Sequence, residues 1–316
     1  MERIAIRTLP DGRLKRLQPV HVCLEGLEDT ILCRDDEDYD AMVKVMVIAA
    51  KKKNVIIVIY AVVSNHFHAT VLALSQEDAH LYGEEVKKRY SMWFSRKHGE
   101  RKAMKHTSVS ALVLENEWHV RNALAYIPRN ALDNGCNVAG YPWSGYSAMF
   151  RPRGEPVQGK PVSALTKRQK EEILHTGDEL KGVGWLLDEQ NHLIPASICD
   201  SRYLEQAFND DPAYFMKTIG TVNPAEMQWR LVDAPRRRQP DTEFLASVND
   251  VSLRWFHLQV GELPVEKKLR LIPYINRTMK TTIPQLARTF RMKREAVTSI
   301  LRQKKSLYLE IENDST

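Results

Sequence analysis

The fold is decided by the stretch VIIVIYAVVSNHFHATVLA, residues 55–73. Its first half, 55–63, is almost wholly apolar and rich in β-branched residues, which is typical of a strand covered on both faces. Ser64 and Asn65 suit a tight turn, and residues 66–73 then continue as a second strand. The stretch therefore predicts an antiparallel pair of strands.

Regular patterns on both sides extend this pair into an α+β domain. Alternation predicts a strand from about residue 19, and apolar residues at helical spacing predict the helices, the first with Asp35 and Asp36 as candidate N-caps. The other elements are a helix at 79–98, a strand at 108–114 and a helix at 117–133. This β-α-β-β-α-β-α order matches the ferredoxin-like, split-βαβ arrangement, which has a four-stranded antiparallel sheet with helices on one face. The last helix is left free to cross the sheet.

Two Pro- and Arg-containing stretches divide the rest of the chain. RPRGEP from residue 151 and APRRRQPD from residue 234 are typical of linkers. We therefore predict a first domain at 1–150, a helical accessory region with linkers at 151–240, and an all-helical domain at 241–316.

The C-terminal domain carries a pattern of its own. Thr282 and Gln285 fit a capping box, and apolar residues on either side of a turn predict a helix-turn-helix near 282–302. An ordinary helical hairpin with a charged, solvated face is the alternative. If the motif is a helix-turn-helix, the following residues would face DNA: Arg294, Thr298, Ser299 and Arg302.

Composition limits the classes of function. The 316 residues are 43% hydrophobic and 27% charged, with a formal net charge of +6, which weakly favours an acidic partner such as nucleic acid. The four cysteines form no CxxC pair, which argues against a zinc ribbon. No apolar run reaches the roughly 20 residues of a membrane helix. We expect a cytoplasmic protein without a membrane partner.

The sequence offers a candidate metal pair at His66 and His68. Side chains two residues apart on a strand point to the same face, so both imidazoles can meet one ion. Phe67 would then point to the opposite face and pack. Histidine pairs are also common on ordinary surfaces, so this pair alone does not decide the function.

Tyr126 and Asn130 are a second candidate pair. Four residues apart on a helix, they share a face. A tyrosine hydroxyl can attack a phosphodiester, and an asparagine carbonyl oxygen is a suitable ligand for Mg²⁺ or Mn²⁺. The alternative is that Tyr126 simply packs on the sheet. Pro128 lies between the two residues and predicts a disturbance of the helix.

Four stretches taken together resemble a known family. They are DDEDYDAMVKVMVIAAKKKNVIIVIYAVVSNHFHATVLA, VKKRYSMWFSRKHG, AYIPRNALDNG and YPWSGY, which fall in that order between residues 35 and 146. Residues 19–150 resemble the single-tyrosine HUH transposases, and within them the REP-associated tyrosine transposases. Two features depart from that family's pattern: Ala131 stands where it usually has proline, and KHTSVSAL replaces its Gly-x-Leu-Trp stretch.

The resemblance implies a function. It makes His66, His68 and Asn130 ligands of a divalent ion, Mg²⁺ or Mn²⁺, and Tyr126 the nucleophile that cuts single-stranded DNA, usually near a hairpin. The products would be a 5′-phosphotyrosine and a free 3′-hydroxyl, with no nucleotide cofactor. It also implies a homodimer and a place at the bacterial nucleoid.

Two other functions remain open from the sequence. One is a DNA-binding regulator that keeps the fold but does not cleave. The other is an RNA-binding protein, since the same sheet topology serves RNA recognition, although the predicted strands lack the interleaved aromatic residues of that class.

Overall fold

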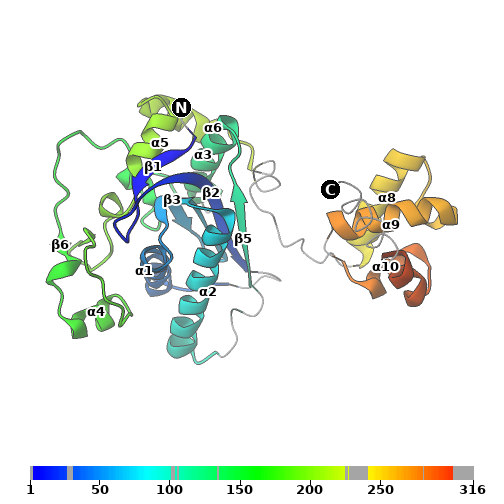
Figure 1. The fold of residues 1–316 in the computed structure, drawn as a ribbon, viewed down its shortest axis with the longest axis horizontal. Helices are drawn as coiled ribbons and strands as arrows, with labels where there is room; N and C mark the ends of the chain where they lie inside the picture. Colours follow the sequence, from blue (N-terminus) through cyan, green and yellow to red (C-terminus); the bar gives the residue numbers. More distant parts are fainter. Residues whose placement is uncertain are drawn as a thin grey trace, which may run out of the picture. The chain divides into compact units, whose positions relative to one another are not determined.

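The computed structural model describes residues 3–26, 31–100, 104, 107–133, 135–224, 227, 241–279 and 281–301. Contacts divide the chain into two compact units, Met1–Ala234 and Pro235–Thr316 (Figure 1). Each unit is described by itself. None of the described helices is long and apolar enough to span a membrane.

An antiparallel sheet forms the centre of the first unit, and with its helices it confirms the predicted α+β class. Its main strands lie in the order β3, β4, β2, β5, with every neighbouring pair antiparallel. Their bounds are Ile56–Val62 for β3, His66–Ala73 for β4, Leu14–Gly26 for β2 and Thr107–Val113 for β5. The strand pair predicted from residues 55–73 is therefore confirmed.

A hairpin at the start of the chain was not predicted. Strand β1, Ala5–Thr8, pairs antiparallel with residues 14–17 of β2, and the turn between them contains Gly12 at φ +86°. That backbone conformation is easily reached only by glycine. Strand β2 therefore begins about five residues before the predicted strand.

Helices α1 and α2 cover one face of the sheet. They span Asp36–Lys52 and Gln76–His98 and pack against each other, as Figure 1 shows. Asp35 is the N-cap of α1, as predicted, and its side chain accepts a hydrogen bond from the backbone N–H of Asp38. The core beneath them contains Phe67 and every second residue of β4 after it.

Helix α3 covers the opposite face. It spans Glu117–Asp133 and packs against β3 and β4, together with α5 at Ser201–Ala207 and α6 at Pro212–Thr221. A second core lies here, with Ile59 and Leu72 from the strands and Leu124 and Ile127 from α3 among its members. The sheet is thus buried on both faces.

The segment after residue 150 packs within the same unit. It contains short elements: β6 at Lys160–Pro161, α4 at Lys167–Ile173 and β7 at Leu186–Leu187. Its apolar side chains join the core beneath α1 and α2; they are Val162, Leu165, Leu174, Leu180, Leu187 and Leu193. Contacts therefore place this segment in one unit with the residues before 150, while the other predicted boundary, at 240, lies close to the division at Ala234.

The second unit is helical in its described part. It contains α8 at Asp241–Phe256, α9 at Val265–Thr278, α10 at Ile283–Phe290, and a further helix at 294–301. Phe244, Leu271, Leu286, Phe290 and Val297 belong to a single core in this unit. Leu286 and Phe290 from the first helix of the 282–302 motif and Val297 from its second helix are therefore buried.

We expect Leu187→Ala to destabilise the whole first unit. Leu187 is fully buried in the core beneath α1 and α2, so its truncation should lower the free energy of unfolding by about 2–5 kcal/mol. Urea denaturation followed by circular dichroism and by tryptophan fluorescence should show both signals shifting together.

Leu81→Ala is the matched control, because Leu81 on α2 is 41% exposed. It should change the unfolding free energy by less than about 1 kcal/mol. If Leu187→Ala melts a separate, low-stability segment while the sheet's transition stays in place, the integration of residues 151–224 is refuted.

Candidate metal and tyrosine site

Strand β4 distributes its first three residues between the two faces of the sheet. Phe67 is fully buried in the core beneath α1 and α2. His66 and His68 lie on the α3 face, where their ring centroids are 4.7 Å apart in an edge-to-face arrangement. The alternation predicted from the sequence is present, and it puts two imidazoles side by side under α3.

Asn130 reaches this pair from α3. Its amide nitrogen donates to the backbone carbonyl oxygens of Tyr126, at 3.0 Å, and Ile127, at 3.1 Å. These two bonds fix the orientation of the amide and turn its Oδ1 toward the strand, 3.3 Å from Nε2 of His66. Three of the predicted site residues are thus brought together from elements 64 positions apart in the chain.

Tyr126 lies one turn before Asn130, on the same side of α3. Its ring centroid is 5.2 Å from that of His68, with an interplanar angle of 64°. The residue is only 5% exposed. All four residues of the predicted site therefore share one location, and the tyrosine is covered in this form.

Pro128 does not break the helix. Helix α3 continues through it from Glu117 to Asp133. Tyr126 before the proline and Asn130 after it both contact the histidine pair. The disturbance expected from a mid-helix proline therefore leaves the two residues on the same side of α3.

The contacts of His66 test whether a cation fits. Its Nδ1 lies 2.8 Å from the Oδ1 of Asn65, which can only accept, so a neutral His66 carries its proton on Nδ1. Its Nε2 then presents a lone pair to Asn130 Oδ1, which is also an acceptor. Two acceptors that face each other at 3.3 Å suit a shared cation. The amide oxygen is a ligand that Mg²⁺ and Mn²⁺ prefer, whereas imidazole nitrogen is a softer donor that also suits other divalent first-row metals.

Acidic residues do not supplement this set. Among the described residues no three His, Cys, Asp or Glu side chains are grouped so as to hold a metal ion. The candidate set has two such residues, His66 and His68, and depends on Asn130 for the third ligand.

His21 on β2 also lies at the site, although no pattern in the sequence pointed to it. Its Nε2 lies 3.0 Å from Nδ1 of His68, and the residue is completely buried. Burial lowers the pKa of His21 to about 3. His21 and His68 are diagonal neighbours on one face of paired strands, which is a contact that only the register of β2 with β4 defines.

Burial also keeps His68 neutral. It holds the pKa of His68 well below its ordinary value, with further lowering from the neighbouring His66 and His21. A neutral imidazole has a lone pair to give to a metal, whereas an imidazolium has none. The environment of His68 thus suits ligation at neutral pH.

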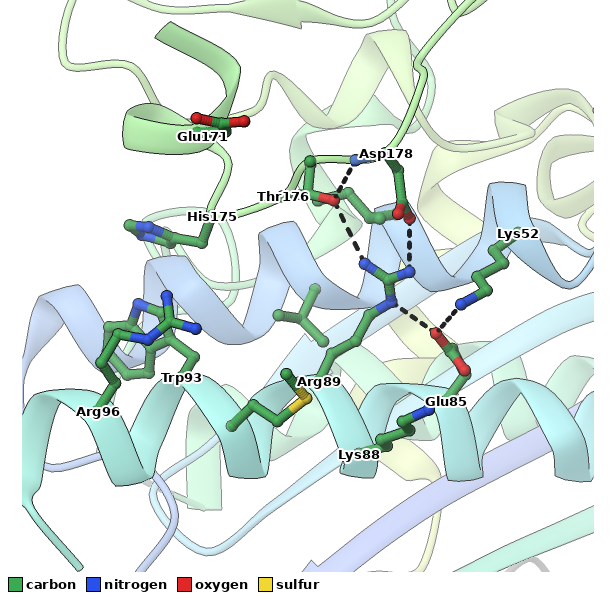
Figure 2. Close-up of a pocket in the computed structure, with 14 residues that line it drawn as sticks. Lys52, Glu85, Lys88, Arg89, Trp93, Arg96, Glu171, His175, Thr176 and Asp178 are labelled. Atoms are coloured by element: carbon green, nitrogen blue, oxygen red, sulfur yellow. Dashed lines mark hydrogen bonds and ion pairs between the residues drawn. The ribbon is translucent and has the colours of Figure 1, made fainter. Parts of the chain in front are cut away.

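A separate cavity of about 560 Å³ lies between α1, α2 and the segment around residue 176 (Figure 2). The guanidinium of Arg89 crosses it and pairs with Glu85 on α2 and Asp178 on the segment, and Lys52 of α1 also pairs with Glu85. These ion pairs fasten the segment to the helices. The cavity is on the α1–α2 face of the sheet and shares no residue with the histidine site.

In the second unit three of the four predicted DNA-facing residues lie on the helix at 294–301. Arg294 and Ser299 are exposed, and Thr298 is half-buried with its hydroxyl donating to the Arg294 carbonyl oxygen. Arg302 lies outside the described residues. Thr282 caps α10 through the N–H of Gln285, as predicted, while the Gln285 side chain bonds to Thr281 and Asp241.

Comparisons with known proteins add one similarity. No family model matches the sequence, and no curated protein matches it. Among solved structures, the chain is similar to a REP-associated tyrosine transposase bound to a REP hairpin. The two share 16% sequence identity, and the alignment covers 46% of this chain and 90% of that chain with a TM-score of 0.34. The functional assignment below rests on the geometry of the site and not on this similarity.

We expect His21 to make the first unit sensitive to acid. Its pKa is about 3 when folded against an ordinary 6.5, so the unfolded chain binds the proton first as the pH falls. The stability contributed by neutral His21 is complete above about pH 6.5 and is lost toward pH 3, at up to about 1.4 kcal/mol per pH unit.

Urea unfolding at pH 7 and pH 5 measures this effect. The loss of unfolding free energy between the two pH values should be smaller in His21→Leu than in the unaltered protein, by about 2 kcal/mol. Equal losses in the two proteins would show that His21 is not buried as a neutral ring.

Proposed function

We propose that the first unit is a metal-dependent nuclease of the single-tyrosine HUH type, which cuts and rejoins single-stranded DNA. The observation that carries the proposal is the contact between His66 Nε2 and Asn130 Oδ1, beside His68 and Tyr126. The strand order supports it, because β4 is an inner strand of the sheet, between β3 and β2, and contacts α3.

In this mechanism the tyrosine and the DNA exchange one bond for another. The Tyr126 hydroxyl loses its proton and forms an Oη–P bond, while the bond from phosphorus to the 3′ oxygen breaks and that oxygen takes up a proton. The products are a 5′-phosphotyrosine and a free 3′-hydroxyl. Because one phosphodiester replaces another, the reverse reaction can rejoin a strand without a nucleotide cofactor.

The ligands support this exchange at the phosphate. His66, His68 and Asn130 would hold a divalent cation, which when bound withdraws charge from the phosphate oxygens and compensates for the weak nucleophilicity of a tyrosine with an ordinary pKa near 10. Asn130 also ties the ligand set to the carbonyl of the nucleophile's own residue. The ligand Asn130 and the nucleophile Tyr126 are thereby held on a common segment of α3.

The burial of Tyr126 favours a second candidate function. At 5% exposure the ring is not open to solvent, so DNA must displace part of its surroundings before attack. A protein in which this opening never occurs would be a DNA-binding regulator with the same fold. Covalent chemistry separates the two functions.

Removing only the hydroxyl, in Tyr126→Phe, should abolish a covalent DNA adduct. Protein with Mn²⁺ and end-labelled, hairpin-tailed single-stranded DNA should give a labelled band that survives a denaturing gel, and the Phe variant should give none while still binding DNA. Tyr146→Phe is the control and should retain the adduct, because the Tyr146 hydroxyl bonds to Met216 outside the site.

Peptide mapping of the adduct locates the attachment. DNA attached to a residue other than Tyr126 contradicts the nucleophile assignment. If the unaltered protein gives no adduct with any hairpin substrate, the regulator is the correct function.

We also propose that residues 241–316 are a DNA-binding domain whose helix-turn-helix consists of α10, a turn at 291–293 and the helix at 294–301. The three-residue turn and the exposed Arg294 at the start of the second helix support this reading. The domain would recognise duplex or hairpin DNA, and the resemblance noted above extends the proposal to a homodimer.

Arg294→Ala should weaken binding to a hairpin target and make it less sensitive to salt. Loss of one phosphate contact reduces the slope of log K against log salt by about 1. Fluorescence anisotropy between 50 and 200 mM KCl measures the slope. Arg254→Ala, which removes an exposed cation of α8 that is paired with Asp250, should leave it unchanged. Equal slopes for the unaltered protein and Arg294→Ala would place the DNA elsewhere.

A further inference from the structure

The contact between His21 and His68 is unusual because both rings are buried. His21 is fully covered and His68 is 2% exposed, with ring centroids 5.1 Å apart. Burying an imidazole is unfavourable unless its nitrogens are hydrogen-bonded, and an apolar side chain would fill the same place without that cost. A buried histidine at this position therefore suggests a function other than packing.

Among the described residues, the His21 side chain has a hydrogen-bond contact with His68 only. Its Nε2 lies 3.0 Å from Nδ1 of His68, while its own Nδ1 is buried and has no hydrogen-bond partner among the described residues. The interaction with His68 is therefore the one polar contact observed for this ring in the described part of the chain.

We propose that His21 is a positioning residue for His68. Its hydrogen bond to Nδ1 of His68 would orient that ring so that Nε2 of His68 faces the divalent cation. This inference rests on the proposed function of the same site. A histidine ligand commonly donates its second ring N–H to a partner, which fixes the orientation and tautomer of the ring. Here the partner is a second histidine on the neighbouring strand.

The bond between two neutral rings can be made in two ways. In one, Nε2–H of His21 donates to Nδ1 of His68, and the proton of His68 then occupies Nε2 and blocks a cation there. In the other, Nδ1–H of His68 donates to Nε2 of His21, and the His68 Nε2 lone pair is open to the cation. The second arrangement puts the His21 proton on its Nδ1, the atom without a described partner.

Cation binding therefore requires both rings to be in their Nδ1–H tautomers. Rings that begin in the first arrangement each move the proton from Nε2 to Nδ1, so the number of protons and the charge stay the same. The Nδ1–H form of His21 is therefore required in the cation-bound protein although His21 is not a ligand. A purely structural role would not require this tautomer.

The first experiment measures Mn²⁺ affinity of the full-length protein by the electron paramagnetic resonance of free Mn²⁺. His21→Leu, which keeps the bulk but not the bond, should weaken binding about tenfold or more. His21→Gln, whose amide can bond to Nδ1 of His68, should stay within about threefold of the unaltered protein. His80→Leu, on the surface of α2, is the control and should have no effect. Undiminished affinity in a folded His21→Leu overturns the proposal.

The second experiment needs no variant that might fail to fold. Long-range ¹H–¹⁵N spectra of the unaltered protein report the tautomer of each imidazole as Mg²⁺ is added. We expect both His21 and His68 to hold the Nδ1–H form in the Mg²⁺-bound protein. A His21 that holds the Nε2–H form while His66 and His68 respond to Mg²⁺ overturns the positioning role but leaves the metal site intact. If none of the three rings responds, the proposed metal site itself fails, and the role of His21 fails with it.

Discussion

The two-residue period of β4 is the constraint on which the rest of the structure depends. Phe67 belongs to the core beneath α1 and α2, and His66 and His68 lie under α3. A shift of one residue would put Phe67 among polar groups and two imidazoles into an apolar core, and burying unbonded polar groups is strongly unfavourable. The packing of Phe67 on one face of β4 therefore determines that His66 and His68 lie on the other face. A change of register would disrupt both faces of the sheet.

The face of the sheet that carries His66 and His68 also contains buried polar side chains. His21, Thr70 and Ser110 each have a buried side-chain atom with no hydrogen-bond partner among the described residues. Such atoms are rare in folded proteins, and apolar residues would make the face more stable. Of these residues, His21 and Thr70 face each other across β2 and β4, next to the site residue His68.

The sequence predicted the parts of the structure that local pattern determines. The β3–β4 pair, the Asp35 cap and helix α3 follow from periodicity and end signals over fewer than twenty residues. The β1–β2 hairpin was missed although Pro10, Asp11 and Gly12 are turn residues. His21 could not be found this way, because its contact with His68 comes from a strand register that joins residues 47 positions apart. The irregular segment from 151 to 200 is likewise held by long-range contacts, such as that of Arg89 with Asp178.

Burial has opposite consequences for the metal ligand His68 and for the nucleophile Tyr126. A covered His68 stays neutral, but the same cover shields Tyr126. The strand side of the site is held by the sheet's hydrogen bonds, so we expect the opening that the proposed chemistry requires to involve α3. Pro128 has no N–H to donate to the carbonyl of Leu124, so α3 lacks one backbone bond within the turn that carries Tyr126. The Asn130 amide bridges that turn through the carbonyls of Tyr126 and Ile127. A cation bound to Asn130 Oδ1 would therefore act on the segment of α3 that holds Tyr126 and lacks the backbone hydrogen bond at Pro128.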